Sequence, residues 1–268
     1  MATSKKVTVV EGGDVSPQQE KKTFVPTAES KGKATQLRLF AVLLWILGIG
    51  AEAGAIFYLY KVGIHTNMDW VWFIGLIVLD LILVIIGSQL WKKANRFDPA
   101  SRKETVKFFL QNQLGVIISV IAFLPLVIVI FTNKDLDGKQ KGILGAIAVV
   151  ALLAAGISSA DFSPPSVEEY TEQTNQIEEL TGGNHVYWTK SGTKYHIYDN
   201  CQHINTSKTD EIFEGTVAQA RELKNITELC KTCEEKAKKA KALSAPVIPQ
   251  PADEEAADTQ PDETAPEN

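Results

Sequence analysis

All three cysteines of the 268-residue chain lie within 33 positions near its C-terminus, and two histidines flank the first of them. Cys230 and Cys233 form a Cys-x-x-Cys pair, and Cys201 follows His196 by five positions. A Cys-x-x-Cys turn places two thiolates about one ion, and Zn²⁺ favours four soft or borderline ligands at tetrahedral corners. The sequence therefore predicts a structural zinc site formed by His196, Cys201, Cys230 and Cys233. The rival nitrogen ligand is His203, two residues past Cys201.

Two other chemistries use the same residue types. Cys230 and Cys233 also match a thioredoxin-like redox pair, but such pairs follow a strand in a larger βαβ fold. Cys201 and His203 are types found in nucleophile dyads, yet no oxyanion motif or orienting partner is visible around them. We therefore expect a metal-binding module and no enzymatic activity.

A second pair of chemically active side chains lies in apolar surroundings. Glu52 and Asp80 are the single charges in two stretches of 22 residues, 39–60 and 70–91. If these stretches are antiparallel helices, the rise of about 1.5 Å per residue puts both carboxyls within about 5 Å of the same depth. They then form either a proton or cation relay, or a protonated acid that hydrogen-bonds a neighbouring helix. The residues alone leave both interpretations open.

Four stretches of the chain are long and apolar enough to cross a membrane. Besides the two that hold the acids, uncharged runs of 26 and 19 residues follow Lys107 and Lys141. About 20 helical residues cover a hydrocarbon core of about 30 Å. We expect a membrane domain of residues 36–160 whose four spanning helices lie at about 39–60, 70–91, 109–131 and 142–160.

Lysines and arginines near these helices predict the orientation. Eleven lie before the first helix or in the second loop, whereas four lie in the first and third loops. Cytoplasmic loops carry the excess of positive charge in membrane proteins. Both termini are therefore expected in the cytoplasm of a bacterial cell with the chain crossing its inner membrane.

Polar segments flank the membrane domain. Residues 1–35 lack a hydrophobic period, which predicts a disordered arm. Residues 161–183 read as a linker that contains a short amphipathic helix. Ser166 and Glu169 form a capping box at its start, and Gly182 ends it.

The acidic C-terminal segment dominates the net charge. Residues 246–268 contain seven acids and no lysine or arginine, so the net charge of −5 leaves +2 for the rest of the chain. This balance argues against a strongly basic nucleic-acid binder. Residues 244–268 as a whole are expected to be a disordered acidic tail.

The predicted zinc ligands lie in a module of residues 184–243. Aromatic and β-branched residues alternate around Ser191-Gly192, which predicts a β-hairpin. A helix is expected over 216–224, and a lysine-rich helix begins at the Cys-x-x-Cys pair. The fold class is therefore mainly α, a four-helix transmembrane bundle with a small α+β zinc-binding module.

A set of motif residues in the module matches a known pattern: the run Gly192-Thr-Lys-Tyr-His196, then Cys201, Ala218 and Ala220, and the Cys230-x-x-Cys233 pair. In this it resembles the small zinc-binding modules related to the metal-binding domain of the Ada DNA-repair protein, which are appended to bacterial nucleases and membrane proteins. The membrane half, at 109–115 and 133–140, is similar to bacterial four-helix membrane proteins of unknown function. The resemblance implies a zinc site and does not imply DNA binding.

We expect a membrane protein that presents its zinc module to the cytoplasm as an adaptor or sensor. The expected partners are the lipid bilayer and a cytoplasmic protein, with nucleic acid disfavoured and homo-oligomerisation open. The first alternative is a small proton- or cation-coupled transporter or channel that uses Glu52 and Asp80. The second is a membrane-tethered nucleic-acid binder.

Overall fold

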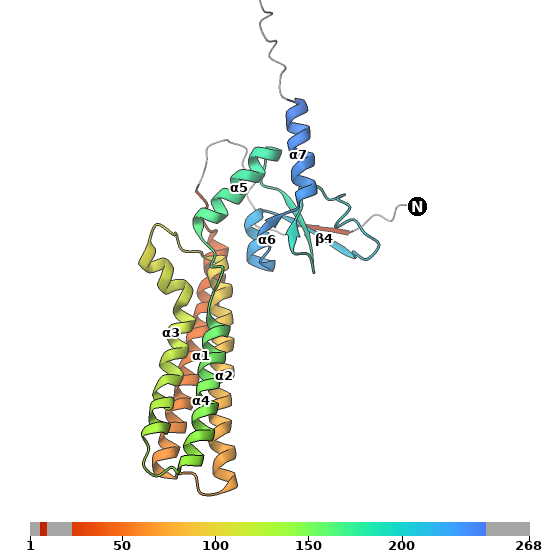
Figure 1. Cartoon of the computed structure of the whole chain (residues 1–268). Helices are drawn as coiled ribbons and strands as arrows, with labels where there is room; N and C mark the ends of the chain where they lie inside the picture. Colours follow the sequence, from red (N-terminus) through yellow and green to blue (C-terminus); the bar gives the residue numbers. More distant parts are fainter. Residues whose placement is uncertain (1–5, 10–22, 245–268) are drawn as a thin grey trace, which may run out of the picture.

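The computed structural model describes residues 6–9 and 23–244, and Figure 1 shows their arrangement. The acidic tail predicted for 244–268 lies outside the described residues apart from Ser244. Most of the predicted N-terminal arm, at 1–5 and 10–22, also lies outside them.

Four long helices form a bundle, and each is long and apolar enough to cross a membrane, as predicted. They are α1 (Ala28–Lys61), α2 (Asn67–Phe97), α3 (Thr105–Thr132) and α4 (Gly138–Ser159). The helices run side by side along one axis, and the described residues that follow α4 are gathered at one end of the bundle (Figure 1). Many large apolar side chains face outward from them, among them Leu39, Phe57, Val71 and Ile157. Such a surface suits lipid better than water.

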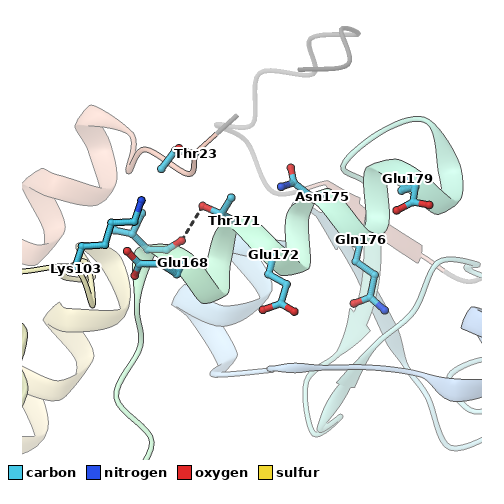
Figure 2. A pocket seen from close by; sticks show the side chains of 9 residues that line it. Thr23, Lys103, Glu168, Thr171, Glu172, Asn175, Gln176 and Glu179 are labelled. Atoms are coloured by element: carbon cyan, nitrogen blue, oxygen red, sulfur yellow. Dashed lines mark hydrogen bonds between the residues drawn. The ribbon is translucent and has the colours of Figure 1, made fainter. Parts of the chain in front are cut away.

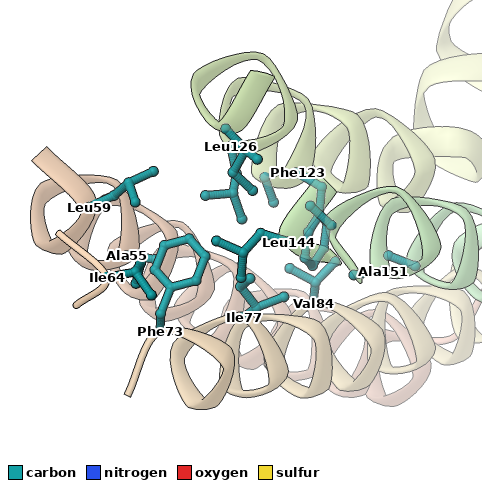
Figure 3. Close-up of a cluster of buried hydrophobic side chains, with 14 of the residues drawn as sticks. Ala55, Leu59, Ile64, Phe73, Ile77, Val84, Phe123, Leu126, Leu144 and Ala151 are labelled. Atoms are coloured by element: carbon teal, nitrogen blue, oxygen red, sulfur yellow. The ribbon is translucent and has the colours of Figure 1, made fainter. Parts of the chain in front are cut away.

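The interior of the bundle is a continuous apolar cluster. Phe73, Ile77, Leu59 and Leu144 meet there and are at most 2% exposed (Figure 3). This part of the cluster lies toward the α1–α2 and α3–α4 loops. Apolar side chains of this cluster fill the interior of the bundle toward that end.

The helix α1 begins eleven residues before the predicted span, at Ala28. Thr27 caps it by accepting a hydrogen bond from the Ser30 amide at 3.1 Å, and Lys33 pairs with Glu29 at 2.6 Å. Phe24 packs on Tyr170 with ring centroids 4.7 Å apart. The predicted disorder over 1–35 is therefore wrong for residues 23–35. A helix cap and tertiary contacts order this segment, and neither gives the sequence a hydrophobic period.

A small α+β module lies beyond one end of the bundle, which confirms the predicted fold class. Its elements are β2 (Val186–Thr189), β3 (Lys194–Tyr195), β4 (Glu211–Gly215), α6 (Val217–Lys224), β5 (Glu228–Leu229) and α7 (Lys231–Ser244). The strand β4 is central, with β1 (Lys6–Val9) parallel on one side and β2 antiparallel on the other. The strands β3 and β5 form a separate parallel pair.

The predicted hairpin forms, but its second strand is short. Tyr187 and His196 exchange two backbone hydrogen bonds of 2.7 Å, and the turn between them is closed by the Gly192 amide on the Thr189 carbonyl at 3.2 Å. After His196 the chain leaves β2. The strand β4, which no sequence pattern predicts, takes the remaining edge of β2.

The linker helix α5 (Val167–Thr181) joins the bundle to the module. The predicted Ser166 cap is confirmed, since its hydroxyl accepts from the Glu169 amide at 3.2 Å. Gly182 ends the helix with a left-handed φ of 79°, as such caps require. The carboxylate of Glu169, predicted to complete a capping box, instead pairs with Arg221 at 3.1 Å.

Candidate metal centre

The structure brings the four predicted ligands together. His196, Cys201, Cys230 and Cys233 are all buried, and their ligand atoms all lie within 4.8 Å of one another. Tetrahedral zinc with metal–ligand distances of about 2.0 to 2.3 Å places its ligand atoms roughly 3.5 to 3.8 Å apart. The Cys233 Sγ and His196 Nδ1 atoms are 3.7 Å apart, so this pair already matches a shared tetrahedral ion. The donor set therefore fits one metal ion.

Backbone pairing puts the ligands in place. The Cys230 amide donates to the Tyr195 carbonyl at 2.9 Å, which brings the start of α7 beside the hairpin. Cys233 lies in the first turn of α7, one turn after Cys230. Cys201 lies in a tight turn whose carbonyl accepts from the Ile204 amide at 3.0 Å. Each ligand is thus positioned by a turn, a strand pair or a helix start that backbone hydrogen bonds define.

Burial shifts the pKa values of two of the ligands in opposite directions. It lowers the pKa of His196 to about 4, with a smaller contribution from the neighbouring His203, so this imidazole is neutral near pH 7. Neutral imidazole is the form that binds a metal. Burial, reinforced by Cys201, raises the pKa of the Cys233 thiol to about 12. A divalent cation reverses that preference, because a coordinating thiol is deprotonated outright.

The rival histidine lies outside the cluster. His203 is exposed, its Nε2 is 3.2 Å from the Thr232 hydroxyl, and its ring centroid is 6.5 Å from that of His196. The structure therefore favours His196 over His203 as the nitrogen donor.

A small apolar core surrounds the cluster. The three cysteines pack with Trp188, Tyr195 and Ile226, each about 1% exposed. This core belongs to a folded unit of only about 60 residues, a size at which a metal often supplies the missing stability. Beside it is a hollow of about 440 Å³ lined by Thr189, Ser191, Gly192, Thr193, Lys194, His196, His203, Ile204, Cys230, Lys231 and Thr232.

The cluster favours a metal site over a redox pair. Cys230 and Cys233 share their surroundings with two further ligands, whereas a redox pair uses the two thiols alone. The sulfur of Cys201 also lies in the cluster, and the hydrogen bond of His203 goes to Thr232.

The intramembrane acids are buried inside the bundle. Glu52 is 4% exposed and Asp80 is 0% exposed. Glu52 Oε1 accepts a hydrogen bond from the Leu126 amide at 3.2 Å, next to Pro125 of α3. Asp80 packs against Gly48, where an added Cβ would lie 2.7 Å from its Oδ1. The structure thus gives the two acids different surroundings.

A second hollow, of about 570 Å³, runs along α5 near Lys103 and Thr23. Figure 2 shows the side chains of Glu168, Glu172 and Glu179 spaced along this helix. The Glu168 carboxylate accepts from the Ser101 hydroxyl and the Arg102 amide, and Glu179 pairs with Lys241 at 3.0 Å. These contacts make the hollow part of the junction between α5 and its neighbours.

No family model matches the chain, and no similar protein is found among curated proteins or among solved structures. The likeness to the Ada metal-binding domain therefore stays a prediction from the motif residues.

Proposed function

We propose that the protein is a multi-pass inner-membrane protein whose cytoplasmic module, folded around one structural Zn²⁺ ion, acts as an adaptor or sensor. The observation that carries the proposal is the buried cluster of His196, Cys201, Cys230 and Cys233. Three thiolates and an imidazole select a soft or borderline ion, and zinc is the usual one in such a set. Four protein ligands fill a tetrahedral shell, which favours a structural over a catalytic ion.

The junction between the module and the bundle supports a role in relaying information. Arg221 is 2% exposed, donates to Gln173 Oε1 at 2.6 Å and lies 4.5 Å from the centre of the Tyr170 ring. The Tyr170 hydroxyl in turn donates to the carbonyl of Arg96, at the end of α2, at 2.7 Å. The module is thus joined to a membrane helix through buried polar contacts, so a partner bound to one can alter the other.

The lysines of α7 support a protein partner over nucleic acid. Lys238 pairs with Glu234 at 2.7 Å and Lys241 pairs with Glu179 at 3.0 Å. Lys236 lies 4.4 Å from the centre of the Tyr198 ring. Cations that already have partners neutralise phosphates less readily, and the alternative binder would need such neutralisation.

Elemental analysis of the purified, untagged full-length protein tests the zinc assignment. We expect one zinc per chain, and we expect a strong chelator to unfold the module while the helical bundle persists, as seen by circular dichroism and by proteolysis after α5. A metal-free protein whose module resists chelator and protease unchanged would refute the proposal. Binding of cytoplasmic proteins to the detergent-solubilised chain should likewise be lost on chelation and restored by added zinc.

A further inference from the structure

Asp80 is a buried acid without a partner. It is 0% exposed, and neither of its carboxyl oxygens has a hydrogen-bond partner among the residues that the structure describes. Gly48 of α1 leaves the room that this carboxyl fills, since a Cβ there would lie 2.7 Å from Oδ1 and 3.2 Å from the Val84 side chain. An unpaired charge in such a place is very unfavourable, so the carboxyl requires a neutralising partner.

The second acid lies about one helical turn further along the bundle. The indole of Trp45 donates to the Val84 carbonyl at 3.3 Å, and the Tyr58 hydroxyl donates to Asp69 at 2.7 Å, which fixes the register of α1 against α2. In this register Asp80 lies close to the level of Gly48, and Glu52 is four residues further along α1, about 6 Å by the helical rise. The two acids therefore lie in the same part of the interior on neighbouring helices.

The neighbouring groups favour a proton over a metal cation. Hard cations take about six oxygen ligands, and neither Gly48 nor the Val84 side chain beside it offers a side-chain oxygen. Glu52 accepts a backbone N–H bond from Leu126, whereas neither carboxyl oxygen of Asp80 has a donor among the described residues. A single proton therefore belongs on Asp80, whose oxygens have no other group to satisfy them.

Buried polar side chains lie at both ends of the bundle, but at the end opposite the module they lie beyond the apolar cluster. Toward the module, the hydroxyl of Ser159 donates to Ser88 at 2.9 Å, and Asn95 donates to the Asn112 side chain at 3.3 Å. Toward the opposite loops, the apolar cluster of Figure 3 lies between the site and the buried Asn133. A through-path for ions is therefore closed on that side.

We propose that Asp80 and Glu52 form a blind proton-binding site inside the bundle, loaded from the end that carries the module, with Asp80 as the group that holds the proton. The site is separate from the metal centre and does not depend on zinc. It gives the membrane domain a proton-binding function of its own, without conduction across the bundle.

Infrared spectroscopy of the full-length protein in lipid vesicles, with ¹³C-labelled aspartate, tests the site directly. We expect a carbonyl band of a protonated carboxylic acid at neutral pH that moves with the aspartate label and shifts in D₂O. The band should vanish in Asp80→Asn and persist in Glu52→Gln, which keeps an oxygen for the Leu126 amide. It should also persist in the matched control Asp135→Asn, whose side chain is exposed in the α3–α4 loop.

Three results would overturn the proposal. The labelled band is missing from the wild-type protein, it survives in Asp80→Asn, or it disappears in Asp135→Asn. Helix content measured on each variant separates these outcomes from misfolding, and Asp80→Asn removes no hydrogen bond of the described interior. The claim that the site opens at one end only is tested in the same vesicles with an internal pH dye. We expect no steady proton flux. A flux that Asp80→Asn abolishes would overturn the proposal.

Discussion

Two histidines seven positions apart in the sequence differ in burial and in their hydrogen-bond partners, and both differences follow from the local backbone. His196 is fixed by its paired bonds with Tyr187 and points into the sulfur cluster, whereas His203 is exposed beside Thr232. A short sequence motif contains both imidazoles and cannot say which one the hairpin turns inward. The ligand types were therefore predictable, and the choice between the nitrogens needed the fold.

Exchanging each histidine for alanine tests this difference. We expect His196→Ala to weaken zinc binding by more than about 100-fold, because even removing a group that only orients a ligand costs about 10- to 100-fold. His203→Ala is the matched control and should retain one zinc per chain. Competition with a zinc-binding dye measures both, and equal loss in the two variants would contradict the assignment.

The buried carboxyl of Glu222 predicts a pH dependence at the junction. Burial raises its pKa from 4.5 to about 7, opposed by the Ser30 hydroxyl, which donates to both oxygens at 3.0 Å, and by Lys33, while Glu29 adds to the rise. A raised pKa means that the contribution to stability is complete below about pH 4.5 and is lost as the pH rises through about 7. The full difference in stability is on the order of 3 kcal/mol for a pKa change of this size.

We therefore expect the contact between α6 and α1 to loosen as the pH rises from about 4.5 to about 7, seen as faster amide hydrogen exchange in α6 after correction for the intrinsic rate. Glu222→Gln should remove this dependence, because it keeps the shape without the titrating proton. The exposed Glu172 supplies the control variant Glu172→Gln, which should behave as the wild type. A pH profile that is unchanged in Glu222→Gln would assign the effect to another group.

At the scale of elements, two glycines of α1 make a matched pair. A Cβ on Gly48 would lie 2.7 Å from Asp80 Oδ1, whereas Gly50 has nothing within 4 Å of the same position. Overpacking a tight interior typically costs about 1 to 3 kcal/mol. We expect Gly48→Ala to lower the thermal stability of the bundle in detergent, and Gly50→Ala to leave it unchanged or to raise it slightly through helix propensity. Equal effects would mean that α1 and α2 do not pack in this register.

The elements divide into those that local patterns predict and those that tertiary contacts create. The four spanning helices, α6 and α7 follow from apolar runs, caps and the Cys-x-x-Cys turn. The strand β4 was missed because Glu211–Gly215 is short and alternates weakly, and it is ordered by β1 and β2 on its two edges. The early start of α1 was missed for a similar reason, since its first turns are held by Glu222 and by the segment around Phe24 that packs on Tyr170.

At the scale of the whole molecule, the orientation across the membrane is a prediction from charge, and two sequons offer a measurement. Asn205 and Asn225 each begin an Asn-x-Thr/Ser sequence and are exposed on the module. In a glycosylating host we expect neither to be modified, because the module faces the cytoplasm. As a control, the same module placed behind a secretory signal should be glycosylated. Modification within the full-length chain would reverse the proposed topology.

The assembly of module and bundle is the least predictable feature. Arg221, Glu169 and Glu222 look like ordinary surface charges in the sequence, yet Arg221 and Glu222 are buried in the junction. Their partners lie 48 to 192 positions away along the chain, so no local pattern indicates them. Sequence reasoning therefore predicted the parts and the ligand set, but not how the parts touch.

The unbroken helix from Ala28 to Lys61 has a mechanical consequence. Its 34 residues span about 51 Å, well beyond a hydrocarbon core of about 30 Å, so Ser30 sits roughly 13 Å outside the lipid on a stiff rod. When a bilayer thins or thickens, spanning helices change their tilt, and a change of about 10° would swing Ser30 by about 2 Å. That displacement is enough to break the hydrogen bond between Ser30 and Glu222. A change in lipid composition can thus alter the contact between α1 and the zinc module.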